Sequence, residues 1–174
     1  MAPALFLFFA VALALRLEAL RISARNEKRL RAKGAQESGA RTSRLLALLH
    51  TAIYLGCLVE GGLRGAQIDT AAQVAGGVYL LAMLALGAVL WTLGRAWTVK
   101  ILFLPDHPID TGPLFRWLRH PNYILNLIPE VTALAVVFDA WITLALLVPA
   151  YLVTLAFRVV QEERALRAIS GEGA

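Results

Sequence analysis

Five apolar segments alternate with polar ones along the chain, and this alternation predicts five membrane-spanning helices. The segments cover residues 3–20, 45–59, 70–93, 123–138 and 140–157. Each is close to the ~20 residues that a helix needs to cross a bilayer, although the second and fourth are shorter. Only Asp139 and its neighbours separate the last two segments. They are therefore expected to form a tight helical hairpin with Asp139 at its turn.

The composition agrees with a membrane protein. Hydrophobic residues make up 59% of the 174 residues and charged residues 17%, and the mean hydropathy is +0.65. Soluble proteins are only about 45–50% apolar. The predicted fold is all-α: a polytopic integral membrane protein that forms a single domain, 1–174, with five transmembrane helices. Cys57 is the only cysteine, so it is interpreted as a buried, inert thiol.

The basic residues predict the orientation of the helices in the membrane. The net charge is +5, and its position between apolar segments argues for membrane orientation rather than for nucleic-acid binding. Arginine and lysine are concentrated after the first helix, after the third and in the tail, whereas Arg64 alone lies between the second and third. The positive-inside rule then places the N-terminus outside, and the C-terminus with all three basic stretches in the cytoplasm.

The basic linker after the first apolar segment permits two interpretations. Residues 23–33 read as a cytoplasmic continuation of the first helix that Gly34 ends. The alternative is an ordinary basic anchor that holds the helix end at the headgroups. Arg16 and Glu18, near the same end, are expected to reach the headgroups and act as anchors.

A long polar segment, 94–123, follows the third apolar segment. It holds five residues that break regular helices, Pro105, Pro108, Gly112, Pro113 and Pro121, and so cannot be one helix. Irregular backbone at membrane depth persists where it lines a cavity or is buried in protein. The segment is therefore expected to wall a polar pocket at the cytoplasmic face. The alternative is an interfacial loop whose histidine and tyrosine contact headgroups.

A second polar group lies where the fifth helix leaves the membrane, in "FRVVQEERAL". Arg158 and Glu162 are four residues apart and share one helix face. They form either a simple surface ion pair or a fixed cation and anion for a ligand. The topology brings this group to the same end of the hairpin as the motif "RHPNY", residues 119–123.

The fourth helix contains a carboxylate at Glu130, with Asn126 one turn before it. Because burying a charge in lipid is costly, Glu130 is expected to face the bundle interior, and Pro129 to kink the helix. The three histidines, His50, His107 and His120, lack metal-ligand spacing, so no metal site is predicted.

"RHPNY" before an apolar hairpin that ends in "FRxxxEE" resembles the isoprenylcysteine carboxyl methyltransferase (ICMT) family. The resemblance covers about 94–166, which would hold the catalytic loop and hairpin. The basic linker "SARNEKRLRAKGAQESGA", with "LLALLH" after it, resembles the first cytoplasmic linker of a bacterial subgroup associated with type III polyketide synthases, and "WTVKIL" resembles the entry to their catalytic loop. The first two helices and this linker would occupy 1–60. Members of the family are small integral membrane enzymes that use S-adenosylmethionine.

The resemblance implies the roles of the matching residues. Cofactor contacts are implied for His107, Phe115, His120, Pro121, Asn122, Tyr123 and Glu162. Arg158 matches the arginine that the family assigns to substrate, and Arg158 with Glu162 would form the catalytic pair. Glu130 and Asn126 are expected to contribute to substrate binding from the bundle interior.

The predicted function is an S-adenosylmethionine-dependent O-methyltransferase acting on a lipophilic acceptor, either a carboxylate or a phenol or enol. It would lie in the bacterial inner membrane, with its cofactor pocket in the cytoplasm at the base of the last hairpin. Membrane lipids are its other expected partners. The alternative is a non-catalytic membrane assembly protein whose basic linker binds anionic lipid or a soluble partner.

Overall fold

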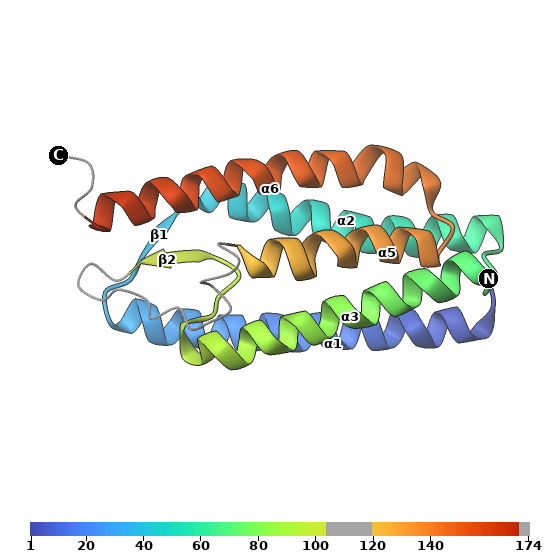
Figure 1. The fold of residues 1–174 in the computed structure, drawn as a ribbon, viewed down its shortest axis with the longest axis horizontal. Coiled ribbons are helices and arrows are strands. Elements are labelled where there is room, and N and C mark those ends of the chain that lie inside the picture. Colours follow the sequence, from blue (N-terminus) through green and yellow to red (C-terminus); the bar gives the residue numbers. More distant parts are fainter. Residues whose placement is uncertain (104–119, 171–174) are drawn as a thin grey trace.

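Helices running along one common direction make up most of the structure, a computed structural model that describes residues 1–103 and 120–170 (Figure 1). The described elements, in chain order, are α1 (Pro3–Ala32), β1 (Gln36–Ser38), α2 (Ala40–Arg64), α3 (Thr70–Leu93), the 3-10 helix η1 (Gly94–Ala96), β2 (Ile101–Phe103), the π-helix η2 (Asn122–Leu127), α5 (Ile128–Val137) and α6 (Trp141–Ser170). The predicted all-α class is confirmed for these residues, apart from one short sheet.

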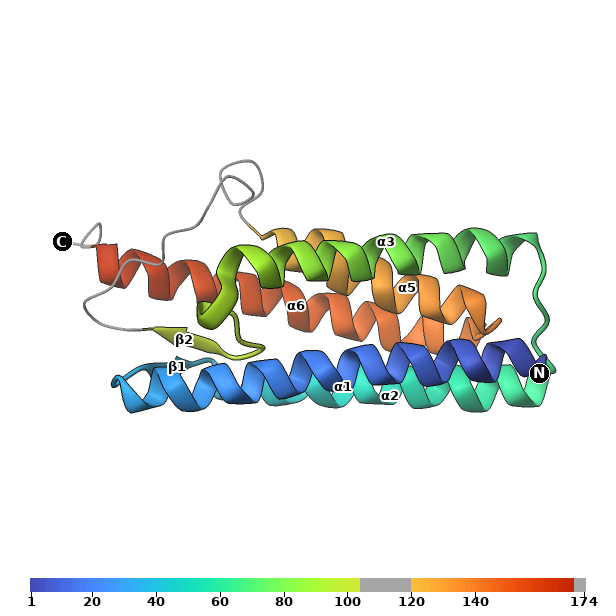
Figure 2. The same cartoon turned by 90° about the horizontal axis from the view of Figure 1, so that it is seen from below.

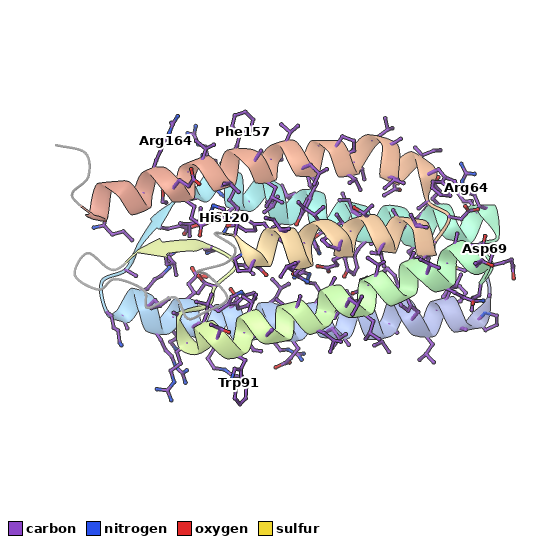
Figure 3. All side chains as sticks on the ribbon, in the orientation of Figure 1. Arg64, Asp69, Trp91, His120, Phe157 and Arg164 are labelled. Atoms are coloured by element: carbon purple, nitrogen blue, oxygen red, sulfur yellow. The ribbon has the colours of Figure 1, made fainter. Side chains whose placement is uncertain are left out.

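Four of the described helices are long and apolar enough to cross a membrane. They are Pro3–Ala32, Ala40–Arg64, Thr70–Ala96 and Trp141–Ala165, and Asn122–Val137 is a shorter apolar helix. Large apolar side chains cover the outside: Trp91 and Phe157, 91% and 63% exposed, project away from the bundle in Figure 3. A multi-pass membrane protein fits these helices, while five complete spans and their orientation stay predictions.

The helices form two sides that meet in one apolar core. Figure 2 shows α1 and α2 along one side of the bundle and α3, α5 and α6 on the other. Within the second side α3 packs on α5, and α2 packs on α6 across the two sides. Phe138, directly after α5, is fully buried in the core, with its ring 5.8 Å from that of Phe9. A Cβ atom at Gly61 would lie 2.8 Å from the Phe138 carbonyl oxygen, so only glycine lets α2 approach so closely.

The last two apolar segments form the predicted tight hairpin. Asp139 adopts a φ of 54° at the turn, and the Ala140 N–H donates to the Ala135 carbonyl at 2.8 Å. The first N–H groups of α6 would otherwise lack partners. The Glu60 carboxylate, reaching across from α2, accepts from Ile142 and Thr143, both at 2.9 Å.

The fourth apolar segment departs from regular helix in a way that the sequence did not predict. Residues 122–127 form a π-helix and the α-helix begins only at Ile128. Pro129, the second residue of α5, has no N–H to donate to the preceding turn. The expected irregularity near Pro129 therefore takes the form of a change from π- to α-helix. Single π-turns of this kind occur often at functional sites.

The basic linker is ordered where the sequence predicted a helical continuation. α1 runs without interruption to Ala32, and Gly34, at a φ of 88°, follows its end. β1 then pairs antiparallel with β2, so that Glu37 lies opposite Leu102. This pairing was not predicted because three-residue strands carry too little alternation to recognise. It fixes the linker to the segment after α3.

Two ends of the bundle differ in what they hold. The N-terminus, the α2–α3 connection and the hairpin turn lie at one end, and the sheet, the start of η2 and the C-terminal end of α6 lie at the other (Figure 1). His120 lies toward this second end, opposite Arg64 and Asp69 (Figure 3). The linker, the start of η2 and the end of α6 therefore meet, as the predicted topology requires.

We expect Gln67→Cys to react with an impermeant maleimide on intact cells and Lys28→Cys to react only after lysis. Both side chains are exposed, and the basic stretches should stay in the cytoplasm. The native thiol of Cys57 is fully buried and gives little background. Labelling of both positions from the same side would refute the predicted orientation.

Candidate functional site

The hydroxyl of Tyr123 lies at the centre of a polar cluster at the basic end of the bundle. It accepts a hydrogen bond from Arg158 Nε at 3.0 Å and donates to Glu162 Oε2 at 2.6 Å. The two charged residues of α6 are thus joined through a tyrosine of η2. In the part of the chain that the structure describes, no direct Arg158–Glu162 ion pair replaces this bridge.

Arg158 ties four segments of the chain together. Its side chain is buried, with 3% of the residue exposed. Nη1 donates to the Ser43 hydroxyl of α2 at 2.8 Å, and Nη2 donates to the carbonyl oxygen of Val99, just before β2. With the bond to Tyr123, these contacts use three of its five N–H groups. A buried guanidinium with so many acceptors has a fixed position.

His120 stacks on the ring of Tyr123. The ring centroids are 5.5 Å apart and the planes differ by 13°. The two imidazole nitrogens face acidic side chains of α6, with Nδ1 3.7 Å from Glu162 Oε2 and Nε2 3.5 Å from Glu163 Oε1. The His120 carbonyl oxygen accepts from the Tyr123 and Ile124 N–H groups at 3.1 and 3.2 Å. The start of η2 thus places this ring against the end of α6.

Two buried oxygens near this cluster have no hydrogen-bond partner within residues 1–103 and 120–170: Asn122 Oδ1 and Gln161 Oε1. Each neighbours a member of the cluster in sequence, Asn122 beside Tyr123 and Gln161 beside Glu162. A buried acceptor without a partner is costly. A ligand that carries an N–H or O–H group would satisfy Asn122 Oδ1, whereas Gln161 Oε1 packs against Gly39 at the start of α2.

The predicted site residues fall into three groups. His120, Tyr123, Arg158 and Glu162 come together in the cluster, Pro121 is buried at its edge as the residue before η2, and Asn122 follows. Glu130 and Asn126 lie deeper in the bundle. His107 and Phe115 lie outside the described residues. The roles assigned to all of these residues stay predictions.

Glu130 belongs to a second polar cluster inside the bundle. It is fully buried, as predicted, and forms an ion pair with Arg16 Nη2. The Tyr54 hydroxyl donates to its Oε1 at 2.6 Å. The expectation that Arg16 reaches the headgroups is wrong: Arg16 is 9% exposed and points inward, because a buried carboxylate needs a cation. Glu18 remains at the surface and pairs with Arg21.

Five of the described helices contribute to this interior cluster. Arg16 Nε donates to His50 Nε2 at 2.9 Å, so the ring proton belongs on Nδ1, which faces the Tyr151 hydroxyl at 3.2 Å. The hydroxyls of Tyr54 and Tyr79 lie 3.0 Å apart. The interior cluster therefore joins α1, α2, α3, α5 and α6 in the apolar part of the molecule.

A constant number of residues separates members of the two clusters along the chain. Seven residues separate a member of one cluster from a member of the other in three places: Ser43 and His50 on α2, Tyr151 and Arg158 on α6, and Tyr123 and Glu130 across η2 and α5. On the two α-helices this spacing is two turns, or about 10 Å. Asn126 lies between the clusters and is fully buried. Its Nδ2 donates to the Ala82 carbonyl at 3.1 Å.

The sequence-based prediction missed Ser43, Val99, Arg16, His50 and the three tyrosines of the interior cluster, Tyr54, Tyr79 and Tyr151. The seven-residue repeat of polar side chains on otherwise apolar helices was the available indication for Ser43, His50 and Tyr151. Val99 had none, because it takes part through its backbone carbonyl and any residue type could stand there.

A third group of charges holds the basic linker in place outside the apolar region. Glu27 Oε1 accepts from Lys100 Nζ at 2.7 Å and from Arg31 Nε at 2.8 Å. Burial alone would raise the pKa of Glu27, but these two hydrogen bonds outweigh it and hold the pKa below its ordinary value. Glu27 therefore remains ionised at neutral pH.

Together, the fold and the site define a class: a helical membrane protein with a cluster of His, Tyr, Arg and Glu at one end. Comparison with known proteins identifies the family. The model of the isoprenylcysteine carboxyl methyltransferase (ICMT) family matches residues 75–168, more than half of the chain. The chain belongs to this family. The matched range contains Tyr123, Arg158 and Glu162, but not Ser43.

Two bacterial relatives match almost the whole chain. An uncharacterized protein of Haemophilus influenzae is 40% identical over 158 residues, 91% of this chain and 92% of that protein. The uncharacterized protein YpbQ of Bacillus subtilis is 26% identical over 166 residues, 95% of this chain and 98% of its own. No solved structure matches the chain.

Removing one member of the interior ion pair should strongly destabilise the protein. We expect Arg16→Ala to lower the free energy of unfolding by about 3–5 kcal/mol, because the Glu130 carboxylate would stay buried without its cation. Arg21→Ala, on an exposed position of the same helix, is the matched control and should change stability little. Thermal unfolding in detergent measures both.

The double variant Arg16→Met with Glu130→Leu separates the charge effect from general damage to the core. Apolar side chains of similar volume can replace a buried ion pair, so the double variant should be more stable than Arg16→Ala. Equal stability of Arg16→Ala and Arg21→Ala would contradict a structural role for the pair.

Proposed function

We propose that this protein transfers a methyl group from S-adenosylmethionine to an oxygen atom of a lipophilic acceptor at the membrane. Membership in the ICMT family implies a methyltransferase that depends on S-adenosylmethionine. The observation that carries the proposal for this chain is the bridge of Tyr123 between Arg158 and Glu162. It fixes a cation and an anion side by side at the basic end of the bundle.

The residues present fit the cofactor. When bound, S-adenosylmethionine supplies an electrophilic methyl group on a sulfonium cation. The carboxylates of Glu162 and Glu163 would attract its cationic portions. Asn122 Oδ1, buried without a partner in the described part of the chain, would accept from one of its N–H or O–H groups. His120 and Tyr123 would form an aromatic wall beside them.

The protein's own contribution would be position and environment. Within residues 1–103 and 120–170, two N–H groups of Arg158 remain beyond its bonds to Tyr123, Ser43 and Val99. These would hold the acceptor oxygen in line with the methyl group, and correct alignment contributes greatly to the rate of such a displacement. The surrounding apolar helices would exclude water and favour a reaction in which charge disappears.

The acceptor would arrive sideways from the lipid. Ile124 and Leu125, directly after Tyr123, are 48% and 36% exposed, and Phe157 lies directly before Arg158. A lipophilic chain in the membrane would therefore contact apolar side chains that adjoin the polar cluster. Both a carboxylate and a phenol or enol fit this arrangement, and the resemblance of the linker to the polyketide-associated subgroup favours the phenol or enol.

A non-catalytic assembly protein is the competing function. The observation that favours it is the outer face of α1, where Arg25, Lys28 and Arg29 are exposed and suited to anionic lipid. Such a protein would have no need of the hydrogen bonds by which Tyr123 joins Arg158 to Glu162. Binding of the cofactor separates the two functions.

The direct test uses the purified protein in detergent with tritium-labelled S-adenosylmethionine. The two probe acceptors are a long-chain alkylphenol and N-acetyl-S-farnesylcysteine. Label in an extracted ether or ester would support the proposal and identify the acceptor class. Absence of cofactor binding by calorimetry would favour the assembly protein.

His120→Ala and Tyr123→Phe should weaken binding of S-adenosylhomocysteine by about 10- to 100-fold. The reason is the loss of an aromatic wall or of a hydrogen bond to a charged group, worth ~1.5–3 kcal/mol. Tyr54→Phe is the matched control, since it removes a buried tyrosine hydroxyl from the interior cluster only. It should lower the melting temperature but leave affinity unchanged, and equal affinity in all four proteins would exclude the assigned role.

Arg158 and Glu162 should contribute to different steps although they share one helix face. Glu162→Ala should raise the dissociation constant of the cofactor. Arg158→Ala should largely spare cofactor binding and reduce methyl transfer by about 100-fold, because an acceptor ~1 Å out of line reacts slowly. Kinetics with each substrate varied separately measure the two effects.

Exchanging the two residues, Arg158→Glu with Glu162→Arg, provides the sharpest control. The exchange keeps both charges but places a carboxylate against the Val99 carbonyl, which cannot donate to it. The exchanged protein should be inactive even where it folds. An active exchange would show that neither residue has the role assigned to it.

A further inference from the structure

One face of α1 is buried from Leu5 to Asn26 with a regular spacing. The buried positions alternate by four and three residues, as on a helix that packs along a single seam: Leu5, Phe9, Ala12, Arg16, Ala19, Ser23 and Asn26. The first members pack in the apolar core. The last two are polar, although the chain could have continued the seam with apolar residues.

Asn26 holds the segment that follows α3. Its Nδ2 donates to the carbonyl oxygens of Gly94 and Trp97, at 3.0 and 2.9 Å, and the residue is 4% exposed. Gly94 turns the chain out of α3 with a φ of 49°, so its carbonyl does not continue the helix. Trp97 is buried against Ala19. The amide of Asn26 therefore fixes both ends of the turn.

Ser23 holds the next residues and reaches the polar cluster through them. Its hydroxyl oxygen accepts from the Val99 N–H at 2.9 Å. The carbonyl of the same residue, Val99, accepts from Arg158 Nη2. Val99 therefore bonds to α1 through its N–H group and to the Arg158 guanidinium through its carbonyl oxygen.

We propose that Ser23 and Asn26 are positioning residues that act through Val99 on Arg158. This inference rests on the proposed function, in which Arg158 orients the acceptor. α1 supplies no group to the reacting atoms; it holds residues 94–99 so that the Val99 carbonyl stands where the guanidinium needs its acceptor. The basic linker is thus part of the enzyme, and both residues lie outside the range that the family model matches, 75–168.

The kinetic test compares Ser23→Ala and Asn26→Ala with Arg25→Ala, a matched control on the exposed side of the same turn. The probe acceptor is whichever of the alkylphenol and N-acetyl-S-farnesylcysteine the unmodified protein methylates. Ser23→Ala and Asn26→Ala should lower kcat/KM for that acceptor by about 10- to 100-fold. The dissociation constant of S-adenosylhomocysteine should stay within about twofold, and Arg25→Ala should change neither quantity. A loss of cofactor affinity equal to the loss of activity would overturn the proposal.

A double-mutant cycle tests whether Ser23 acts through Arg158. In the Arg158→Ala background, Ser23→Ala should lower the rate less than about twofold further, since residues that share one path are not additive. The same loss in both backgrounds would show that Ser23 acts independently and would refute the proposal. Ser23→Thr keeps the hydroxyl and should restore most of the activity.

Hydrogen exchange provides a readout that does not require activity. Ser23→Ala should speed exchange of the Val99 amide, and Arg158→Ala should speed it too, because both hold the same residue. The control Arg25→Ala should leave it unchanged. If the unmodified protein methylates neither probe, the proposed function fails. Exchange of the Val99 amide still tests whether Ser23 is connected to Arg158 through Val99. An unchanged Val99 amide in Arg158→Ala would contradict the link itself.

Discussion

A charge inside an apolar bundle must find its partners within the protein, and this constraint organises the whole molecule. Two arginines, Arg16 and Arg158, are buried here. Neither can be solvated by lipid, so each collects acceptors from several helices. The helices are positioned by these contacts as well as by apolar packing, which has little directional preference between one lipid-like surface and another.

The two arginines meet this constraint in different ways. Arg16 is paired with a carboxylate, and the tyrosines and the histidine around them complete a closed network in the interior. Arg158 has no such partner within the described residues and is bonded to a phenol, a hydroxyl and a carbonyl, all neutral. Its charge is therefore held in position without being neutralised. That difference suits Arg16 to a structural role and Arg158 to binding a partially negative oxygen.

Periodicity and charge were sufficient to predict much of the fold. The hydrophobic pattern gave all five helices, with α3 correct at both ends, and Asp139 marked the hairpin turn. The predicted α2 was too short because Arg41, Thr42 and Arg44 are polar yet compatible with helix. The sheet and the π-helix were missed, since both depend on pairing and backbone geometry that no residue pattern of this length specifies.

The polar cluster was predicted only in part, for a related reason. Its side chains come from two motifs, and the hairpin topology was enough to bring His120, Tyr123, Arg158 and Glu162 together. Tyr123 could not be recognised as the bridge between the two charges, because that depends on how η2 meets α6. Arg16 was misplaced by a rule for helix ends: proximity to the headgroups predicts an exposed cation, but a carboxylate on another helix provides the stronger attraction.

The spacing of the buried positions on α1 also fixes the number of residues between Arg16 and Ser23. Arg16 contacts the interior cluster, while Ser23 and Asn26 contact the segment next to Arg158. Insertion of one residue between positions 16 and 23 would rotate everything beyond it by about 100° about the helix axis. The two contacts could then not be made by the same face. Substitutions on the exposed side of α1 leave this register intact, whereas insertions and deletions in this short interval should be strongly excluded among functional relatives.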